Sequence, residues 1–270
     1  MKTRVIASAV LLPLLAIAVF LLPTLVTAIL FAVLSALAAF ELLRGTGLVR
    51  HNRLVIYSMV MAALVPIWSH YGQNYAVALL GIMVFFVAVF GEMMASHVKI
   101  PFEKVAYCIF AGLLLPFLFS SLIRIHVSYS GRYLIVIPFL LAFLSDSGAY
   151  FAGRFFGHHK LAAVISPKKT VEGAVGGALT AIIGMLLYAL IMKLAFSFQA
   201  NFGLAVLYGV IGSAAGVFGD LCFSVIKRQT GIKDYGNLIP GHGGVLDRFD
   251  SMMVIGPLTE ALLILLPVVV

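Results

Sequence analysis

The stretch Ser224–Asp250 reads SVIKRQTGIKDYGNLIPGHGGVLDRFD, a polar segment in an otherwise apolar chain. Glycine, proline and asparagine interrupt its middle part, Thr230–Gly244, which therefore cannot be one continuous helix. Because this loop carries charges of both signs between two apolar segments, we expect it to hold the chemistry of the protein, with the rest of the chain presenting it at a membrane face. Its charged and titratable residues are Lys227, Arg228, Lys233, Asp234, His242, Asp247, Arg248 and Asp250.

Composition indicates a membrane protein. Apolar residues make up 63% of the chain and charged residues only 10%, whereas charged residues make up about 25% of a soluble domain. Runs of about 20 apolar residues recur along the whole length, and each is long enough to cross a bilayer as a helix. The sequence therefore predicts an all-α fold, a polytopic helical bundle integral to the membrane.

Hydropathy predicts about nine spanning helices. A retained first helix is favoured over a cleaved signal peptide, because the apolar character continues past Pro23 to Leu43. Two connections are long, Arg154–Thr170 and Lys227–Asp250. The predicted spans are Val5–Leu22, Thr24–Leu43, Leu54–Ser69, Tyr75–Ser96, Val105–Ile123, Tyr133–Gly153, Val171–Phe196, Gly203–Ile226 and Ser251–Val270.

The basic residues give this topology an orientation. With nine spans, all of the 18 Lys and Arg residues except Arg124, Arg132 and Lys193 fall on one side. The positive-inside rule makes that side cytoplasmic, so the N-terminus lies inside, the C-terminus outside and both long connections in the cytosol. This topology accounts for the net charge of +8, and no nucleic-acid partner is expected. Residues 1–100 are expected to be membrane helices of unassigned role, and residues 101–270 the catalytic region.

Two acidic residues fall inside predicted spans. Asp146 and Asp220 each lie six or seven residues, or roughly 10 Å, from the predicted cytoplasmic end. Carboxylates inside a membrane mark functional sites by default, although a neighbouring base could simply neutralise each of them. A polar stripe continues from Asp220 through Ser224 to Lys227 at helical spacing. Asp247 and Asp250 precede the last span, where either could instead be the N-cap of that helix.

Two segments are candidates for binding phosphate. Ser166–Thr170 is expected to open the seventh span, with Ser166 as N-cap and Pro167 in the first turn. Lys168 and Lys169 would then face the positive end of the helix dipole, which favours an anion bound there, although both could simply follow the positive-inside rule. The turn Pro240–Gly244 offers the backbone N–H groups of Gly243 and Gly244 to an anion. Within it, His242 could contact phosphate or merely fill the turn.

Carboxylates near one membrane face, surrounded by basic residues, favour a magnesium site. Mg²⁺ is usually bound by one or two carboxylates together with substrate phosphates. Phosphoryl-type transfer needs little more than metal ions, cationic side chains and positioning. Such a site could receive a lipid headgroup from the bilayer and a soluble nucleotide from the cytosol.

Ser224–Asp250 resembles the signature of the phosphatidate cytidylyltransferase (CDP-diacylglycerol synthase) family. The stretch Asp146–Arg154 is similar to a second family block, with tighter spacing and Ser147 where Thr is expected, and Ser166–Gly173 resembles a third. The resemblance covers the C-terminal half by motif and the N-terminal third by hydropathy alone. The signature positions filled here are Ser224, Lys227, Arg228, Lys233, Asp234, Gly236, Pro240 to Gly244, Asp247, Arg248 and Asp250.

The resemblance implies transfer of CMP from CTP to phosphatidic acid, giving CDP-diacylglycerol and pyrophosphate. It implies that Asp220 and Asp247 bind Mg²⁺, with Asp250 and Asp146 as further ligands or supporting groups, and the number of metal ions stays open. No general base is needed, since a phosphatidate oxygen is already anionic at neutral pH. The residues implied to hold phosphates are Lys227, Arg228, Lys233 and Arg248, joined by Lys168 and Lys169.

Two other functions compete with this interpretation. A CTP-dependent lipid kinase of the polyprenol type would transfer the terminal phosphate and release CDP. An ion-coupled secondary transporter would use Asp146 and Asp220 as ion sites, but no internal repeat of the kind common in transporters is visible. The expected location is the inner, cytoplasmic membrane with the site facing the cytosol. The oligomeric state stays open, a homodimer being one option.

Overall fold

The computed structural model describes residues 13, 16–17, 19–72, 74–97, 99–238 and 243–269. These residues form helices and one short β-hairpin, which confirms the predicted all-α class. The elements are α2 (Thr24–Phe40), the π-helix η1 (Glu41–Gly45), α3 (Asn52–Tyr71), α4 (Tyr75–Ala95), α5 (Phe102–Ile109), the π-helix η2 (Phe110–Leu114), α6 (Leu115–Phe119), α7 (Ser121–Val127), α8 (Gly131–Leu134), α9 (Val136–Phe156), β1 (Lys160–Ala162), β2 (Ser166–Thr170), α10 (Val171–Ala195), α11 (Phe202–Gln229), α12 (Leu246–Phe249) and α13 (Met252–Leu265).

Seven helical stretches among the described residues are long and apolar enough to cross a membrane, as expected of an integral membrane protein. They correspond to the second through eighth predicted spans. The first predicted span, Val5–Leu22, lies mostly outside the described residues. The ninth corresponds to α13, whose 14 residues extend about 21 Å, less than the roughly 30 Å hydrocarbon core. The count of nine spans and the orientation of the termini stay predictions.

The chain divides into two compact units. The first contains the described residues of Met1–Arg132 together with Lys227–Phe249, and the second contains those of Tyr133–Ile226 and Asp250–Val270. Most of the polar segment that opened the sequence analysis therefore belongs with the N-terminal helices. The proposed functional boundary near residue 100 stays a prediction.

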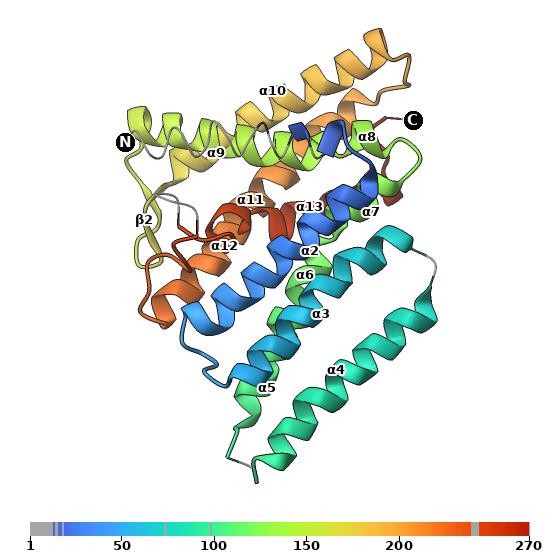
Figure 1. Cartoon of the computed structure of the whole chain (residues 1–270). Helices are drawn as coiled ribbons and strands as arrows, with labels where there is room; N and C mark the ends of the chain where they lie inside the picture. The colour runs from blue at the N-terminus through green and yellow to red at the C-terminus, as the bar shows by residue number, and fades with distance from the viewer. Residues whose placement is uncertain are drawn as a thin grey trace. The chain divides into compact units, whose positions relative to one another are not determined.

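An aromatic chain runs through the core of the first unit. The ring centroids of Phe31 on α2 and Phe119 on α6 lie 4.7 Å apart. Phe119 also packs against Phe249 at the end of α12, with centroids 5.0 Å apart. Since aromatic pairs at these separations add to the stabilisation from burial, they attach the end of the polar segment to the membrane helices. Figure 1 shows the ribbons of α2, α6 and α12, on which these residues lie.

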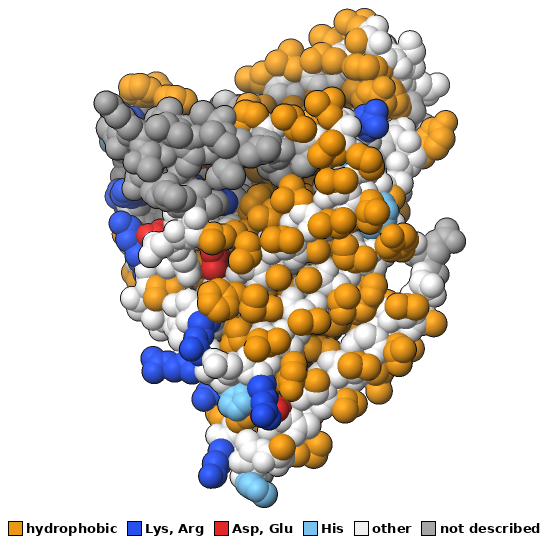
Figure 2. Space-filling view, in the orientation of Figure 1, with side chains coloured by type: hydrophobic (Ala, Val, Ile, Leu, Met, Phe, Trp, Pro, Cys, Tyr) orange, Lys and Arg blue, Asp and Glu red, His pale blue; other side chains and the backbone are white. Residues whose placement is uncertain are grey.

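The surface of the first unit fits a membrane environment. Figure 2 shows apolar side chains covering α2, α3 and α4, and α4 buries only Phe85 and Val89 along its length. Basic side chains gather at one end of these helices, as the predicted topology requires of a single membrane face. Exposed residues of that end include Arg44, Arg50, Arg53 and Lys99.

Small residues bring α9 and α10 together in the second unit. A Cβ placed on Gly177 would lie 2.7 Å from the Ser145 carbonyl oxygen, so the helices could not approach this closely with a larger residue there. Thr180 Oγ1 donates a hydrogen bond of 2.8 Å to the Leu144 carbonyl. Small residues and interhelical hydroxyl bonds are the usual means by which helices associate within a membrane.

The connection Arg154–Thr170 contains a feature that the sequence analysis did not predict. β1 and β2 form an antiparallel hairpin in which Lys160 pairs with Thr170. The expectation that Ser166 caps a helix and Pro167 lies in its first turn is wrong, because Ser166–Thr170 is a strand. The N-cap of α10 is Thr170, whose Oγ1 accepts a hydrogen bond of 3.1 Å from Gly173 N. Lys168 and Lys169 precede the helix, so the dipole argument for an anion in its first turn no longer applies.

Candidate active site

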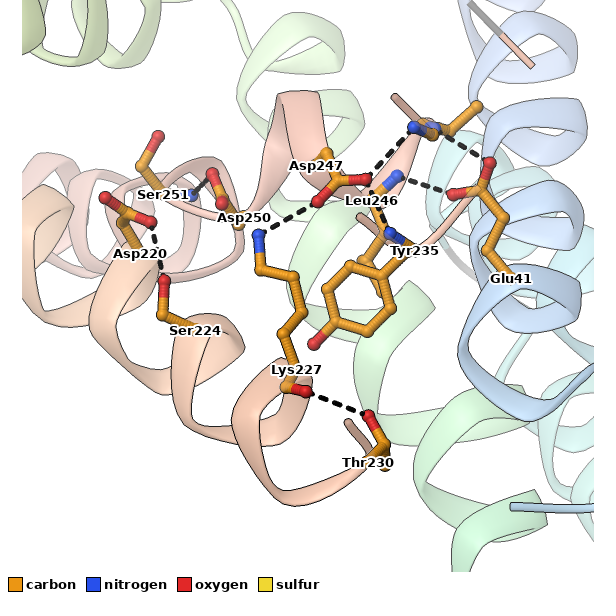
Figure 3. A network of polar contacts seen from close by, with 12 residues as sticks. Glu41, Asp220, Ser224, Lys227, Thr230, Tyr235, Leu246, Asp247, Asp250 and Ser251 are labelled. Atoms are coloured by element: carbon orange, nitrogen blue, oxygen red, sulfur yellow. Dashed lines mark hydrogen bonds and ion pairs between the residues drawn. The ribbon is translucent and has the colours of Figure 1, made fainter. Parts of the chain in front are cut away.

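A cluster in the second unit contains three of the predicted site residues. Asp220 lies on α11, and Ser224, one turn later, donates a hydrogen bond of 3.3 Å from Oγ to Asp220 Oδ1 (Figure 3). The other carboxylate oxygen, Oδ2, lies 2.5 Å from the ammonium of Lys169 on β2. We call Lys169, Asp220 and Ser224 the Asp220 cluster. The hairpin therefore places the Lys169 ammonium beside Asp220, one of the two acidic residues that fall inside predicted spans.

The Asp220 cluster is partly open to solvent. The side chains of Lys169 and Asp220 are 24% and 32% exposed. An ion pair with this much exposure contributes little net stability, because both charges could be hydrated instead. The Lys169 ammonium also donates to the Val217 carbonyl at 3.4 Å. The pair is thus a weak contact that an arriving ligand could exchange.

Asp250 lies on the segment that packs beside this part of α11. A Cβ on Gly219 would meet the Asp250 carbonyl oxygen at 3.0 Å, so glycine next to Asp220 permits the close approach. Asp250 Oδ1 accepts a hydrogen bond of 2.8 Å from the backbone N–H of Ser251. The alternative that Asp247 or Asp250 is the N-cap of the last helix is wrong, because the N-cap of α13 is Ser251.

Asp146 lies on α9 and is exposed. The preceding residue, Ser145, is buried and faces α11, with its hydroxyl 3.5 Å from the position of a Cβ on Gly216. Asp146 and the Asp220 cluster therefore belong to the same unit, on helices that contact each other.

A second network, in the first unit, is centred on Asp247 at the start of α12. Its Oδ1 accepts a hydrogen bond of 2.9 Å from Lys227 Nζ. Its Oδ2 accepts two backbone hydrogen bonds, from Tyr235 N at 2.7 Å and from Gly244 N at 3.0 Å. Lys227 Nζ also lies 5.3 Å from the centroid of the Tyr235 ring. We call Lys227, Tyr235, Gly244 and Asp247 the Asp247 network (Figure 3).

The Asp247 network is buried, in contrast to the Asp220 cluster. The side chains of Asp247 and Lys227 are 2% and 12% exposed. A buried carboxylate requires charge pairing and hydrogen bonds to offset its desolvation, and Asp247 has one cation and two N–H donors. Its contacts join Lys227 and Tyr235, which precede residues 239–242, to Gly244, which follows them. These contacts therefore fix the conformation of the backbone around Asp247.

Glu41 is a site residue that the sequence analysis missed. It is 5% exposed and accepts hydrogen bonds from two backbone N–H groups of the polar segment. No local signal could have identified it, because its partners lie 204 and 205 residues away. The feature that distinguishes Glu41 in the sequence is that it is an acidic residue at the end of an apolar run.

The remaining predicted residues are mostly exposed. Gly243 adopts φ = 86°, a conformation that favours glycine, and Gly244 is buried. His242 and Pro240 lie outside the described residues, so the predicted phosphate-binding turn is described only at its end. The exposed basic residues are Lys168, Arg228, Lys233 and Arg248.

The Asp220 cluster fits a metal ion better than the Asp247 network does. Asp220 already accommodates the positive charge of Lys169 and remains partly open, whereas a metal at Asp247 would have to displace one of three hydrogen bonds. In the part of the chain that the structure describes, no three His, Cys, Asp or Glu side chains gather as a metal-binding group. Mg²⁺ commonly binds through fewer protein ligands than that, since water and substrate phosphates complete its coordination.

Comparison with known proteins agrees with this chemistry. The chain is 46% identical over 134 residues to a phosphatidate cytidylyltransferase of Staphylococcus haemolyticus, and 47% identical over 134 residues to that of Staphylococcus saprophyticus. The protein of that name from Staphylococcus aureus is 46% identical over 138 residues. The chain spans about half the length of these curated relatives, and half of the chain is covered in each case. A model described as "Cytidylyltransferase family" matches residues 2–266, so the chain belongs to the cytidylyltransferase family.

Proposed function

We propose that the protein is a phosphatidate cytidylyltransferase, which transfers CMP from CTP to phosphatidic acid and releases pyrophosphate. The observation that carries this proposal is the 46–47% identity to relatives bearing that name. The resemblance of Ser224–Asp250 to the family signature, in which every fixed position is filled, supports it further. The substrates are then CTP in the aqueous phase and phosphatidic acid in the membrane.

The acidic residues of the second unit would hold Mg²⁺. Asp220 is the first candidate, with Asp250 and Asp146 as further ligands. Asp247, in the first unit, is a ligand on the family resemblance alone, and an ion there would have to replace one of its three hydrogen bonds. When bound, the ion offsets the repulsion between the two anionic substrates and stabilises the pyrophosphate leaving group. A second ion is compatible with the number of carboxylates. Supporting this assignment, the Asp220 carboxylate is the one that already lies against an exchangeable cation.

Basic side chains would bind the phosphates. Lys227 and Arg248 are assigned to the reacting phosphates, and Arg228 and Lys233 to the remaining charge of CTP. Lys168 and Lys169 belong to the hairpin and would contact phosphate when the pair between Lys169 and Asp220 opens. Ser224 supports Asp220 through its hydrogen bond. The N–H group of Gly243, with His242, would complete the anion-binding turn, whereas the predicted Gly244 N–H already donates to Asp247 Oδ2.

The reaction needs no protein base. A phosphatidate oxygen is anionic at neutral pH and can attack the α-phosphorus of CTP directly. A new oxygen–phosphorus bond forms while the bond to the β-phosphate oxygen breaks, and the electron pair leaves with pyrophosphate. The protein contributes orientation of the two substrates and cationic groups around the developing charge. Both substrates can reach a site at the cytosolic face of the inner membrane, which is the location we propose.

One assay separates the proposal from its alternatives. Purified protein in detergent is given phosphatidic acid, Mg²⁺ and CTP labelled at the α-phosphate, and the lipid phase is chromatographed. We expect label in the lipid, which a terminal-phosphate kinase or a transporter would not produce. Absence of lipid label from folded, Mg²⁺-supplied protein would contradict the proposal, and γ-labelled CTP with polyprenol would then test the kinase. Asp220→Asn should abolish transfer, whereas Glu103→Gln, an equivalent change at an exposed carboxylate, should not.

A further inference from the structure

Glu41 begins a break in the second predicted span. The helix α2 ends at Phe40, and the next five residues, Glu41–Gly45, form the π-helix η1. A π-helical turn inserts an extra residue and is found disproportionately at functional sites. Here it places an acidic residue at the point where the N-terminal helices contact the polar segment, with Glu41 buried and 5% exposed.

The Glu41 carboxylate binds the backbone immediately before Asp247. Oε1 accepts a hydrogen bond from Val245 N and Oε2 accepts one from Leu246 N, each 2.9 Å long. The preceding N–H, that of Gly244, donates to Asp247 Oδ2. Two carboxylates therefore hold three consecutive backbone N–H groups, and Figure 3 shows Glu41 and Asp247 approaching this turn.

Two glycines of the polar segment leave room for Glu41. A Cβ on Gly236 would lie 2.7 Å from Glu41 Oε1, and a Cβ on Gly244 would overlap the same carboxylate. Gly45, at the end of η1, is equally constrained, since its Cβ would meet the Tyr235 carbonyl oxygen. The glycines of η1 and of the loop therefore approach the opposite segment too closely to carry a Cβ.

Burying the Glu41 carboxylate costs more free energy than burying an apolar side chain of similar size would. Burial of an ionised group must be offset by hydrogen bonds or opposite charge, and among the described residues no basic side chain forms an ion pair with Glu41. A neutral side chain of similar size would pack at lower cost, but only a carboxylate offers two acceptor oxygens to two adjacent N–H groups. This geometry makes Glu41 suited to fixing the position of the turn.

We propose that Glu41 is a positioning residue for the reaction, which acts by fixing the turn that carries Asp247 and, through Asp247, the ammonium of Lys227. This gives the N-terminal helices a role, namely to hold one side of the polar segment in a single geometry. The catalytic part of the inference rests on the proposed cytidylyl transfer, whereas the fixing of the turn does not.

The first test measures the turn itself by hydrogen–deuterium exchange of peptides spanning Tyr235–Phe249. In the unmodified protein, the amides of Val245 and Leu246 should be protected relative to those of the exposed residues Lys233 and Asp234. Glu41→Gln keeps the size but sets an amide NH₂ group against one of the two N–H donors. Loss of a hydrogen bond to a charged group should raise exchange in this peptide by about tenfold or more.

Two further variants make this result specific. Glu103→Gln applies the same chemical change to an exposed carboxylate of the same unit and should leave the exchange unchanged. Glu41→Asp retains the charge with a shorter reach and should give an intermediate rate, which also provides a variant if Glu41→Gln does not fold. Unprotected Val245 and Leu246 amides in the unmodified protein would overturn the proposal without any variant.

The second test separates positioning from mere stability. Loss of folded protein lowers the maximal rate and leaves KM unchanged, whereas a misplaced Lys227 should raise KM for CTP. We expect Glu41→Gln to raise this KM by about threefold or more and to lower kcat per folded molecule by about tenfold, with partial recovery in Glu41→Asp. Faster exchange with both constants unchanged would overturn the catalytic role. If the unmodified protein transfers no label to lipid, the proposed function fails, while the exchange experiment still decides whether Glu41 fixes the turn.

Discussion

Removing the Lys227 ammonium should destabilise the protein, because it leaves the Asp247 carboxylate buried with backbone donors alone. Lys227 Nζ and Asp247 Oδ1 lie 2.9 Å apart, and the two side chains are 12% and 2% exposed. Breaking a buried pair by removing one partner costs about 3–5 kcal/mol. Asp247 keeps its hydrogen bonds from Tyr235 N and Gly244 N, so the lower end applies. We expect Lys227→Met to cost about 3 kcal/mol.

The buried thiol of Cys108 provides the assay. The chain has two cysteines, and in a Cys222→Ser background the buried Cys108 reacts with a fluorogenic maleimide only when the protein opens. Cys108 and Lys227 belong to the same compact unit. A change of 1 kcal/mol shifts the midpoint of a chain this large by about 2–4 °C. The midpoint of Lys227→Met should therefore fall by about 6–12 °C.

A double-mutant cycle identifies the cause of the shift. Asp247→Asn should cost about 3 kcal/mol, and the double variant about 4 rather than 6, since each change removes the same ion pair. Lys233→Met is the matched control, the same change at an exposed lysine of the same unit, and it should cost about 0.5 kcal/mol or less. A midpoint for Lys227→Met equal to that of Lys233→Met, or strict additivity in the cycle, would refute the reasoning.

Three other predictions each concern a contact between residues of the same compact unit. Lys169→Met should tighten binding of Mn²⁺, measured by electron paramagnetic resonance as a magnesium substitute, by up to about fivefold, because the competing pair is partly exposed and is worth about 1 kcal/mol or less; unchanged affinity would show that Lys169 does not compete. Gly177→Ala should lower the thermal midpoint of unfolding, since the added Cβ would lie 2.7 Å from the Ser145 carbonyl and overpacking costs about 1–3 kcal/mol; an unchanged midpoint would mean that α9 and α10 separate freely. Phe119→Ala should cost about 3–5 kcal/mol by removing the ring between Phe31 and Phe249, and a loss below about 1 kcal/mol would contradict that packing.

Hydropathy predicted the long helices well because a spanning helix is a local property of the sequence. The expected span Tyr75–Ser96 is found as Tyr75–Ala95, and Val171–Phe196 as Val171–Ala195. In both cases the apolar run is bounded by polar or turn-forming residues on each side. A spanning helix satisfies its backbone hydrogen bonds within its own segment, so its bounds depend little on contacts with distant segments.

The hairpin was not predicted because its stability depends on pairing between two short strands. Ser166 and Pro167 are good helix-start residues in isolation, yet β2 instead pairs with β1 and Thr170 caps the helix. Neither strand is long enough to show a clear alternation of apolar and polar residues. Local preference was therefore consistent with two structures, and the contact that decides between them is the pairing of β2 with the neighbouring strand β1.

The sequence singled out Asp220 and Asp247, and their metal-binding role stays a prediction. The sequence offered no basis for separating the two, although Asp220 precedes the signature stretch and Asp247 lies within it. The structure gives them different surroundings, since Asp220 is 32% exposed beside one exchangeable cation, whereas Asp247 is 2% exposed and has three donors. A ligand that must bind and leave in each cycle is better served by the carboxylate whose contacts cost least to break. This contrast favours Asp220 as the residue that exchanges partners. It favours Asp247, on a turn whose backbone Glu41 binds at Val245 and Leu246, as the residue that keeps Lys227 in place.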